Sequence, residues 1–245
     1  MEGFFYTSIL YLYKMNYNLL ICCLLYISCI YSQSTRIDHI IYLVNDLEET
    51  ISTYESKGFT IKRGYKHENG IENAHIKFNN ESSVEFISLY KQPTDAIAIY
   101  YQEQLVKREG FEFICLTGID LDTLSNSLND RNIEHTTSKG KFWSYLTFPK
   151  TSALSIFFFI EYKTKLIEDK KYTSHTNGIN QIENVSIQGN YEMIKFLELL
   201  DLEFDNKSYK TSTGNIIIES KNSETPQILR TIASEGNTTN KIMID

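Results

Sequence analysis

The stretch Arg36–Leu47, RIDHIIYLVNDL, decides the fold of the chain. Its β-branched and aliphatic residues predict a strand, and Asp46 near its end is a typical N-cap for a following helix. His39 lies in the middle of this strand, and strict alternation places it on the same face as Ile37 and Ile41. The imidazole therefore belongs to an otherwise apolar row. Two alternatives are open: a histidine satisfied within the core, or a histidine that acts as a ligand in a site.

A strand, a helix and three further strands, in the order βαβββ, make up a first unit over residues 34–92. The helix ends at Gly58, and the runs FTIKRGY, NAHIKF and SVEFISLY predict the three later strands. A second unit with the same order occupies residues 110–165. Its opening, FEFICLTGIDL, aligns with IDHIIYLVNDL, and Phe113 takes the place of His39. The chain therefore repeats itself.

Residues 93–109 predict a helix that links the two units, and a degenerate third copy of order βαββ occupies residues 176–234. Asn184 takes the place of His39 in this copy, and residues 235–245 form a polar tail that we expect to fray. A single unit has an open sheet edge and half a core, and pairing two units removes both problems. We therefore predict an α+β fold in which two βαβββ modules pair into a curved, barrel-like cup, with a partial third module.

The N-terminal segment, residues 1–33, differs from the rest of the chain. It holds an uncharged apolar run that follows a lysine, which is typical of a signal peptide and short for a membrane span. Cleavage before Gln33 is the preferred interpretation, and Met15 is an alternative start. Retention as a membrane anchor and lipidation at Cys29 are the competing interpretations. We expect the protein to be exported, periplasmic or secreted, with membrane contact only through this segment if it is retained.

Composition narrows the function further. The net charge is -7 and there is no long basic run, so no nucleic-acid partner is expected. The hydrophobic fraction of 42% allows a sizeable core without disulfide bonds. Three of the four cysteines lie in the N-terminal segment. Cys115 remains, within an apolar strand, where inert packing is expected.

Four segments in order carry a resemblance to a known family: IDHIIYLVNDLEETISTYESKGF, HENGIENAHIKF followed by VEFISL, FFFIEYK, and HTNGINQIENVSI. Together with the repeated βαβββ order, they resemble the glyoxalase-like domain family of the vicinal oxygen chelate superfamily. The similarity covers roughly residues 36–202 and is weaker in its last third. It implies a divalent metal ion held inside the cup and a small-molecule ligand.

The superfamily places a metal-binding histidine on the first strand of a unit and a glutamate on the fourth, which here implies His39 and Glu85. The second unit has Phe113 in the histidine position, so one family ligand is absent. Glu161 in FFFIEY is the candidate carboxylate of that unit, and the candidate catalytic base if it is not a ligand. Counting back from the shared YK instead places Phe157 opposite Glu85. Imidazole with carboxylate suits zinc, manganese, iron or nickel.

Further residues are candidates for substrate contact. The resemblance places His67, Asn73 and His75 in a segment that lines the mouth of the cup, and it gives His175 a role at the site. Trp143 is a candidate floor for a ligand. Each has a plainer alternative: a solvated hairpin histidine, a turn residue or a packed ring. His75 alternates with a lysine, which predicts an exposed face.

The leading hypothesis is an exported, metal-dependent lyase or isomerase that acts on a small substrate with neighbouring oxygens. The metal would act as a Lewis acid while a carboxylate moves a proton. A binding protein that uses the same cavity without metal is the alternative, and the missing histidine at Phe113 favours it. A structural relic is a third class.

Overall fold

The structure is a computed structural model, and it describes residues 35–164, 167–220, 227–236 and 240–244. The predicted N-terminal segment, residues 1–33, lies outside the described residues. Among the residues that are described, no helix is both long and apolar enough to cross a membrane.

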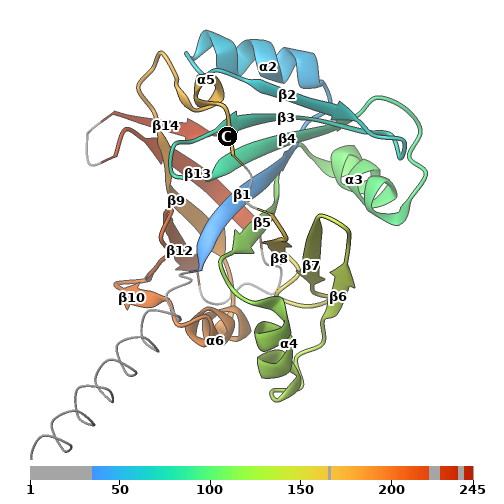
Figure 1. Ribbon diagram of the computed structural model, residues 1–245, viewed down its shortest axis with the longest axis vertical. Helices are drawn as coiled ribbons and strands as arrows, with labels where there is room; N and C mark the ends of the chain where they lie inside the picture. The colour runs from blue at the N-terminus through green and yellow to red at the C-terminus, as the bar shows by residue number, and fades with distance from the viewer. Residues whose placement is uncertain (1–34, 165–166, 221–226, 237–239, 245) are drawn as a thin grey trace, which may run out of the picture. The chain divides into compact units, whose positions relative to one another are not determined.

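The first two modules form one sheet. Their elements are β1 (Arg36–Leu43), α2 (Leu47–Ser56), β2 (Lys62–Lys66), β3 (Ile71–Lys77), β4 (Ser83–Leu89), α3 (Ala96–Lys107), β5 (Gly110–Thr117), α4 (Leu121–Asn129), β6 (Thr136–Lys139), β7 (Trp143–Thr147) and β8 (Phe157–Tyr162). The strand order is β2-β3-β4-β1-β5-β8-β7-β6 (Figure 1). β1 runs parallel to β4, β5 runs parallel to β8, and β1 and β5 join the two modules antiparallel. The predicted α+β fold with paired βαβββ modules is confirmed, and the sheet is open rather than closed into a barrel.

The remaining elements form a second sheet. They are α5 (Lys170–Thr173), β9 (Gln181–Gln188), α6 (Tyr191–Leu199), β10 (Glu203–Asp205), β11 (Ser208–Lys210), β12 (Asn215–Ser220), β13 (Gln227–Ser234) and β14 (Lys241–Ile244). The order is β10-β11-β12-β9-β13-β14, with β12 parallel and β13 antiparallel to β9, as β4 and β5 are to β1. The third copy therefore has a complete set of strands. The predicted tail, residues 235–245, contains β14, which pairs with β13.

Side-chain oxygens begin the helices at the same place in each copy. Asp46 accepts a hydrogen bond from the Glu49 amide at 2.9 Å, Asp120 caps α4 and Asn190 caps α6. Each cap satisfies a backbone N–H that has no partner within the helix. The strand-to-helix junction predicted from Arg36–Leu47 is therefore built as expected.

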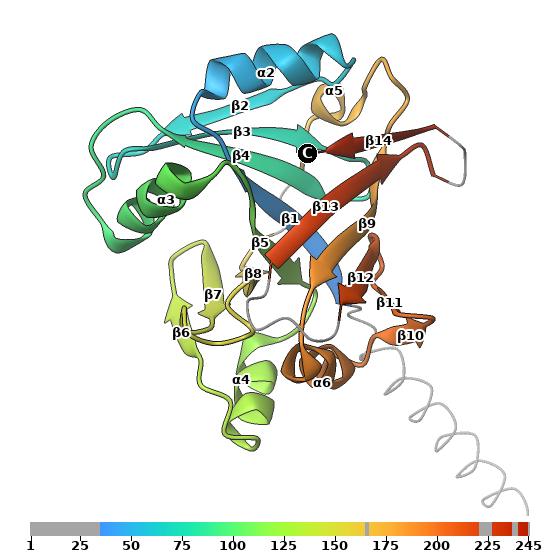
Figure 2. The same cartoon turned by 180° about the vertical axis from the view of Figure 1, so that it is seen from behind.

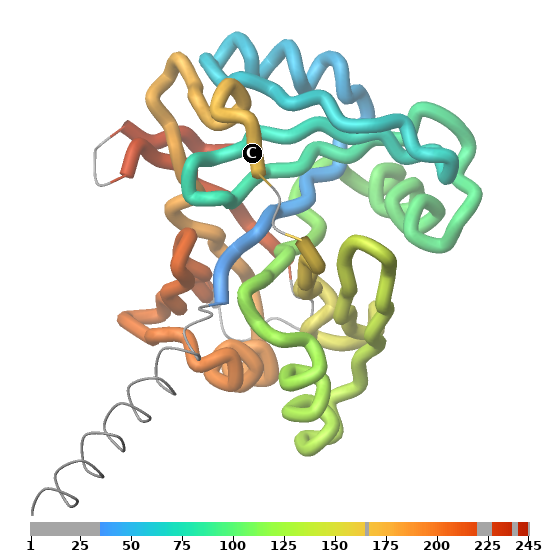
Figure 3. The backbone as a smooth tube through the Cα atoms, viewed as in Figure 1, coloured from blue at the N-terminus to red at the C-terminus, as the bar shows by residue number. Residues whose placement is uncertain are grey.

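The two faces of the first sheet have different surroundings. One face packs against α2, α4 and the second sheet in a large apolar core that includes Ile37, Ile40 and Phe86. Figure 2 shows β13 and β9 on this side, and β13 contacts β5. The other face carries a smaller cluster around Ile41 and Ile87, which α3 covers in part. The candidate site lies on this second face, along the seam where β1 and β5 lie side by side (Figure 3).

A β-bulge in β1 corrects the alternation predicted from the sequence. Ile37 pairs with Leu116 and His39 pairs with Cys115, so Asp38 is an extra residue between two consecutive pairs. A bulge re-aims the side chains that follow it. Ile37 therefore faces the large core, whereas His39 and Ile41 face the other side of the sheet.

Candidate functional site

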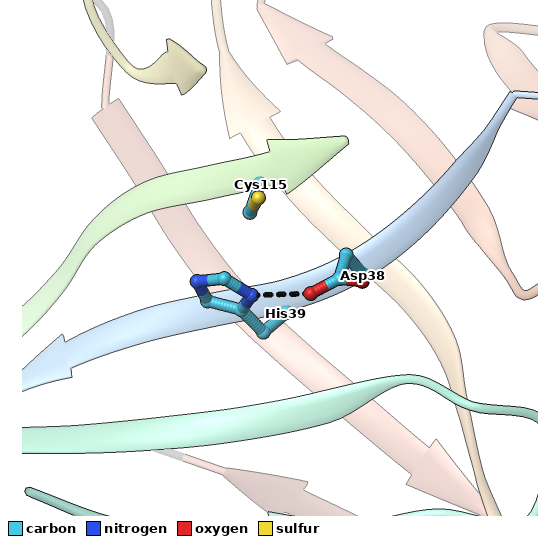
Figure 4. A group of neighbouring side chains, drawn as sticks. All are labelled: Asp38, His39 and Cys115. Atoms are coloured by element: carbon cyan, nitrogen blue, oxygen red, sulfur yellow. Dashed lines mark hydrogen bonds and ion pairs between the residues drawn. The ribbon is translucent and has the colours of Figure 1, made fainter. Parts of the chain in front are cut away.

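The site is built around His39, which lies between two carboxylates. Its Nδ1 is 2.6 Å from Asp38 Oδ1, and its Nε2 is 3.4 Å from Glu85 Oε2 (Figure 4 shows the first contact). All three side chains are largely buried. A carboxylate thus faces each ring nitrogen of His39.

Asp38 orients the imidazole ring of His39. Burial raises the pKa of Asp38, but hydrogen bonds from His39 and Tyr162, with the nearby charges, lower it further, so the net shift is downward. The Tyr162 hydroxyl donates to Asp38 Oδ1 at 3.0 Å, and burial raises the pKa of Tyr162. Asp38 is thus an ionised acceptor, and His39 donates its Nδ1 proton to it. The Nε2 atom is left facing Glu85, and metal-binding histidines commonly have a carboxylate on the other ring nitrogen in this way.

Glu85 is held by Asn73. Asn73 Nδ2 donates to Glu85 Oε1 at 2.6 Å, and the Tyr65 amide donates to Asn73 Oδ1 at 2.9 Å, which sets the orientation of the side-chain amide. Burial raises the pKa of Glu85, but His75, His39 and Asn73 together lower it below the ordinary value. Gly64 permits this contact, because a Cβ there would lie 1.9 Å from Asn73 Oδ1.

His75 on β3 and Glu85 on β4 are a cross-strand pair. Its Nε2 is 3.9 Å from Glu85 Oε1 and 3.3 Å from Asn73 Nδ2. Only 16% of its side chain is exposed, so the exposed face predicted for it is wrong, since this face of β3 is covered. Burial lowers the pKa of His75 to about 4. Its Nδ1 is buried with no hydrogen-bond partner.

Aromatic rings from the second module face this polar cluster. The Phe158 ring lies edge-on to His39 with centroids 5.5 Å apart, and it contacts Phe113 and Tyr145. Register places Phe158 beside Cys115, as Glu85 lies beside Ile41 in the first module. Phe158 therefore takes the place of Glu85, and the alignment that gave this place to Phe157 is off by one residue.

Glu161 is not brought to the cluster. Alternation along β8 turns Phe158 and Tyr162 toward His39 and Asp38, and Glu161 to the opposite face. Glu161 pairs across the ladder with Ser144. The second module thus contributes Phe158 where a carboxylate was expected.

The other predicted substrate residues lie outside the central cluster. Trp143 pairs with Tyr162 across the ladder, and its ring contacts Tyr145 on the same face. His67 is exposed in the β2–β3 turn, where its backbone carbonyl accepts from Tyr90. Asn184 takes the place of His39 in the third copy, and its Nδ2 donates to Glu183 Oε1 at 3.2 Å.

His175 ties the segment before β9 to the first module. The Thr60 amide donates to its Nδ1 at 3.0 Å, and its Nε2 donates to the Lys77 carbonyl at 2.9 Å. Its ring also contacts Phe59 and Phe78. Burial lowers the pKa of His175, and the bond to Lys77 offsets this in part. The structure therefore gives His175 a bridging position rather than a place beside His39.

We expect His175→Phe to lower the free energy of unfolding at neutral pH by about 1–3 kcal/mol, because the Thr60 amide and the Lys77 carbonyl lose their partner. Protonated His175 cannot accept from Thr60, and its folded-state pKa lies below the ordinary 6.5. The bridge therefore stabilises the wild type fully above pH 6.5 and less as the pH falls below that value. Chemical denaturation from pH 5 to pH 8 checks this. A difference between wild type and variant that grows toward acid pH contradicts it.

Two groupings around His39 differ in how well they suit a metal ion. Asp38, His39 and Cys115 offer ligand atoms within 4.8 Å of one another (Figure 4). The 2.6 Å separation of Asp38 and His39 is a hydrogen-bond distance, shorter than two ligands on one ion allow. The buried Cys115 thiol has its pKa raised well above the ordinary value by burial. In contrast, ligands about 2.1 Å from a tetrahedral zinc ion lie roughly 3.4 Å apart, and His39 Nε2 and Glu85 Oε2 are 3.4 Å apart. The residues fit a metal ion on the Glu85 side of His39.

Sequence reasoning missed Asp38, His75 and Tyr162 as members of the cluster. One signal for Asp38 was present, since two consecutive polar residues, Asp38 and His39, interrupt an apolar strand. In a regular strand two consecutive side chains point to opposite faces, so one of these two polar side chains would enter the core without a partner. A bulge lets both avoid the core. Nothing in the sequence pattern gives the partner of Tyr162, because it lies 124 positions from Asp38.

Comparisons with known proteins agree with this architecture. The family model described as "Glyoxalase-like domain" matches residues 37–192. A crystal structure of a hypothetical protein from Staphylococcus aureus has a TM-score of 0.59 at 17% identity and covers 84% of this chain and 93% of that chain. A variant methylmalonyl-CoA epimerase from Streptomyces coelicolor, in complex with 2-nitronate-propionyl-CoA, has a TM-score of 0.42 at 17% identity over 55% of this chain and 99% of that chain. The methylmalonyl-CoA epimerase from Mycobacterium tuberculosis has a TM-score of 0.42 at 15% identity over 52% and 88%. Comparison with curated proteins gave no match.

Proposed function

The chain belongs to the glyoxalase-like domain family, and from this premise we propose that it is a metal-dependent lyase or isomerase for a small substrate with neighbouring oxygens. His39 and Glu85 would hold the divalent metal ion, which can be zinc, manganese, iron or nickel. The observation that carries the proposal is the position of His39 Nε2. Asp38 accepts a hydrogen bond from His39 Nδ1, and His39 Nε2 faces Glu85 Oε2 at 3.4 Å.

Each residue of the cluster has a defined task in this proposal. When bound, the metal ion supplies a Lewis acid for a substrate oxygen. Asp38 and Tyr162 orient His39, and Asn73 orients Glu85. Tyr145, whose pKa burial raises to about 12, stays protonated at neutral pH and can donate a hydrogen bond to substrate.

The second module supplies an apolar wall. Phe113 and Phe158 exclude water from the side of the cluster that faces β5 and β8. Exclusion of water strengthens the electrostatic interaction of bound substrate with His39 and Glu85. The wall also removes two donor positions, so a bound ion keeps open coordination positions for substrate oxygens.

The proposal is tested on untagged protein in two steps. Metal analysis and titration with zinc or manganese should give one ion per chain. The loaded protein should then catalyse exchange of a C–H proton next to a carbonyl with deuterated water, for a panel of small hydroxy-carbonyl compounds. Absence of specific metal binding overturns the metal-dependent interpretation.

A binding protein without metal is the second candidate, and the replacement of second-module donors by Phe113 and Phe158 favours it. An imidazole, two carboxylates and aromatic rings can bind a small polar molecule directly. A ligand that binds equally well with and without a strong chelator supports this candidate over the enzyme.

We further propose that the protein is exported, on the basis of the uncharged apolar run within residues 1–33. N-terminal sequencing of the protein from its native host should begin near Gln33. A mature chain that still carries residues 6–13 contradicts cleavage and supports an anchor.

A further inference from the structure

We propose that Lys62 and Lys77 bind a carboxylate group of the substrate, beside the metal ion that the proposed function places at His39. The substrate is then a small acid whose carboxylate lies a few bonds from its neighbouring oxygens. In this structure the Glu168 carboxylate takes the position of that substrate group. The inference deepens the proposed function by naming the class of substrate, and it rests on that function for the place of the metal ion.

The strand register places both lysines on the face that carries the site. Lys77 pairs with Ser83 and Ser83 pairs with His39, so the three residues lie in one row across β3, β4 and β1. Lys62 pairs with His75 in the neighbouring row. Paired residues point to the same face of a sheet, and two strand spacings, roughly 10 Å, separate the backbones of Lys77 and His39. A substrate of a few carbon atoms can therefore reach the metal ion and a flexible lysine at once.

Glu168 indicates which group the two lysines bind. Lys62 Nζ donates to both oxygens of its carboxylate, to Oε1 at 2.9 Å and to Oε2 at 2.7 Å. Glu168 precedes α5, which contacts β3 (Figure 1), so the carboxylate comes from the segment between the second and third modules. Both side chains of this ion pair are about one-third exposed. The position is therefore half-buried and already accommodates a carboxylate.

Lys77 has donor capacity for a closer anion. Only 21% of its side chain is exposed, and its Nζ lies 3.4 Å from Ser83 Oγ and 3.9 Å from Glu168 Oε1. Both distances exceed the value of about 2.8 Å that is typical of a hydrogen bond between an ammonium group and a carboxylate. An ammonium group has three donors, and burial of its charge is costly unless an anion lies close. A substrate carboxylate between the two lysines would supply that anion.

The charges around the site give the lysines a reason to be there. The chain has a net charge of -7, and two carboxylates, Asp38 and Glu85, face the His39 ring. These surroundings repel an acidic substrate. Lys62 and Lys77 reverse the sign locally, so the carboxylate end of the substrate would be held two strands away from His39 and its other oxygens would face the metal ion.

Lys77→Met tests the proposal with two probes, 2-oxoglutarate and its 5-methyl ester, which differ in charge at the end away from the oxo group. Zinc-loaded wild type should bind the diacid at least about 10-fold more tightly than the ester, as expected for one charge-assisted hydrogen bond, and the variant should lose this preference. Calorimetry measures both affinities. The variant keeps the buried stem and is not a ligand, so its zinc affinity should not fall. Lys62→Met should lose the preference in the same way.

Lys66→Met is the matched control, because Lys66 also lies on β2 but is 67% exposed and pairs with Glu72. It should keep the preference of the wild type. Glu168→Gln removes the competing charge and should raise affinity for the diacid at least about threefold. An unchanged or lower affinity would mean that Glu168 is a structural link and would overturn its role as a stand-in for substrate.

Failure of this inference is distinguishable from failure of the proposed function. If wild type binds zinc but does not prefer the diacid, or if both lysine variants keep the preference, the carboxylate-binding site is wrong and the metal site stands. If wild type binds no zinc, the metal-dependent function fails. A preference for the diacid that persists without metal and is lost in Lys77→Met then still supports the lysine site, and its absence overturns both.

Discussion

His39→Ala is expected to lower divalent-metal affinity by at least about 1,000-fold while the fold survives. The change removes the one imidazole whose free nitrogen is positioned by an ionised partner, Asp38, and faces Glu85. A site with two or three protein ligands cannot lose one of them and keep tight binding. The apolar core on the opposite face of the sheet does not involve His39, so circular dichroism should be unchanged.

His135→Ala serves as the control for loss of an imidazole, because that histidine bonds to Ser125 on α4, away from the site. If His39→Ala binds metal as the wild type does, the ion lies elsewhere and the role given to Asp38 is wrong. A metal-free wild type together with a strongly destabilised His39→Ala variant would mean that the histidine in RIDHIIYLVNDL is a core residue held by Asp38 and Glu85.

Gly64→Ala is expected to destabilise the protein by about 2–3 kcal/mol and to weaken the site at the same time. The new Cβ would lie 1.9 Å from Asn73 Oδ1, so the side-chain amide must move. Movement breaks its bonds with the exposed Tyr65 amide and with Glu85, and the buried Glu85 carboxylate that loses its hydrogen bond contributes about 1–3 kcal/mol. Urea denaturation measures the effect.

A double-mutant cycle with Asn73→Ala identifies the cause. Most of the effect of Gly64→Ala should disappear in the Asn73→Ala background, because the atom that is displaced is no longer there. An equal effect in both backgrounds would assign the destabilisation to the Asn73 backbone carbonyl, which lies 2.9 Å from the position that a Cβ of residue 64 would occupy.

The architecture follows from the sequence because it rests on periodic patterns. Apolar strands, Asp46 and Asp120 as helix caps, and the alignment of Phe113 with His39 all repeat at matching places. Repetition makes the pairing of modules a physical necessity, since each leaves an open edge. β14 escaped prediction because Lys241–Ile244 is a short edge strand whose pairing with β13 depends on tertiary context.

The site was only partly predictable because it depends on register. The bulge at Asp38 changes which residues share a face, and a shift of one residue decides whether Phe157 or Phe158 faces His39. His75 was expected to be exposed because it alternates with Lys77. The face of β3 that carries His75 is instead covered, and Asn73 on the same face contacts His75 and donates to Glu85. Side-chain partners so far apart in sequence leave no local pattern.

The third copy shares the bulge of the first module but not its histidine. β9 has the same register shift, with Glu183 as the extra residue between Ile182 and Asn184. Glu183 there contacts Asn184 and Lys241, so the bulge recurs without an imidazole. The bulge is a repeated feature of the strand, and His39 is what gives the first module its candidate metal site.

The most direct test of the central claim is anomalous diffraction at the zinc edge from crystals grown with zinc. One strong peak is expected about 2.1 Å from both His39 Nε2 and a Glu85 carboxylate oxygen. A peak between Asp38 and Cys115, or no peak near His39 under conditions where zinc is in excess, would contradict it.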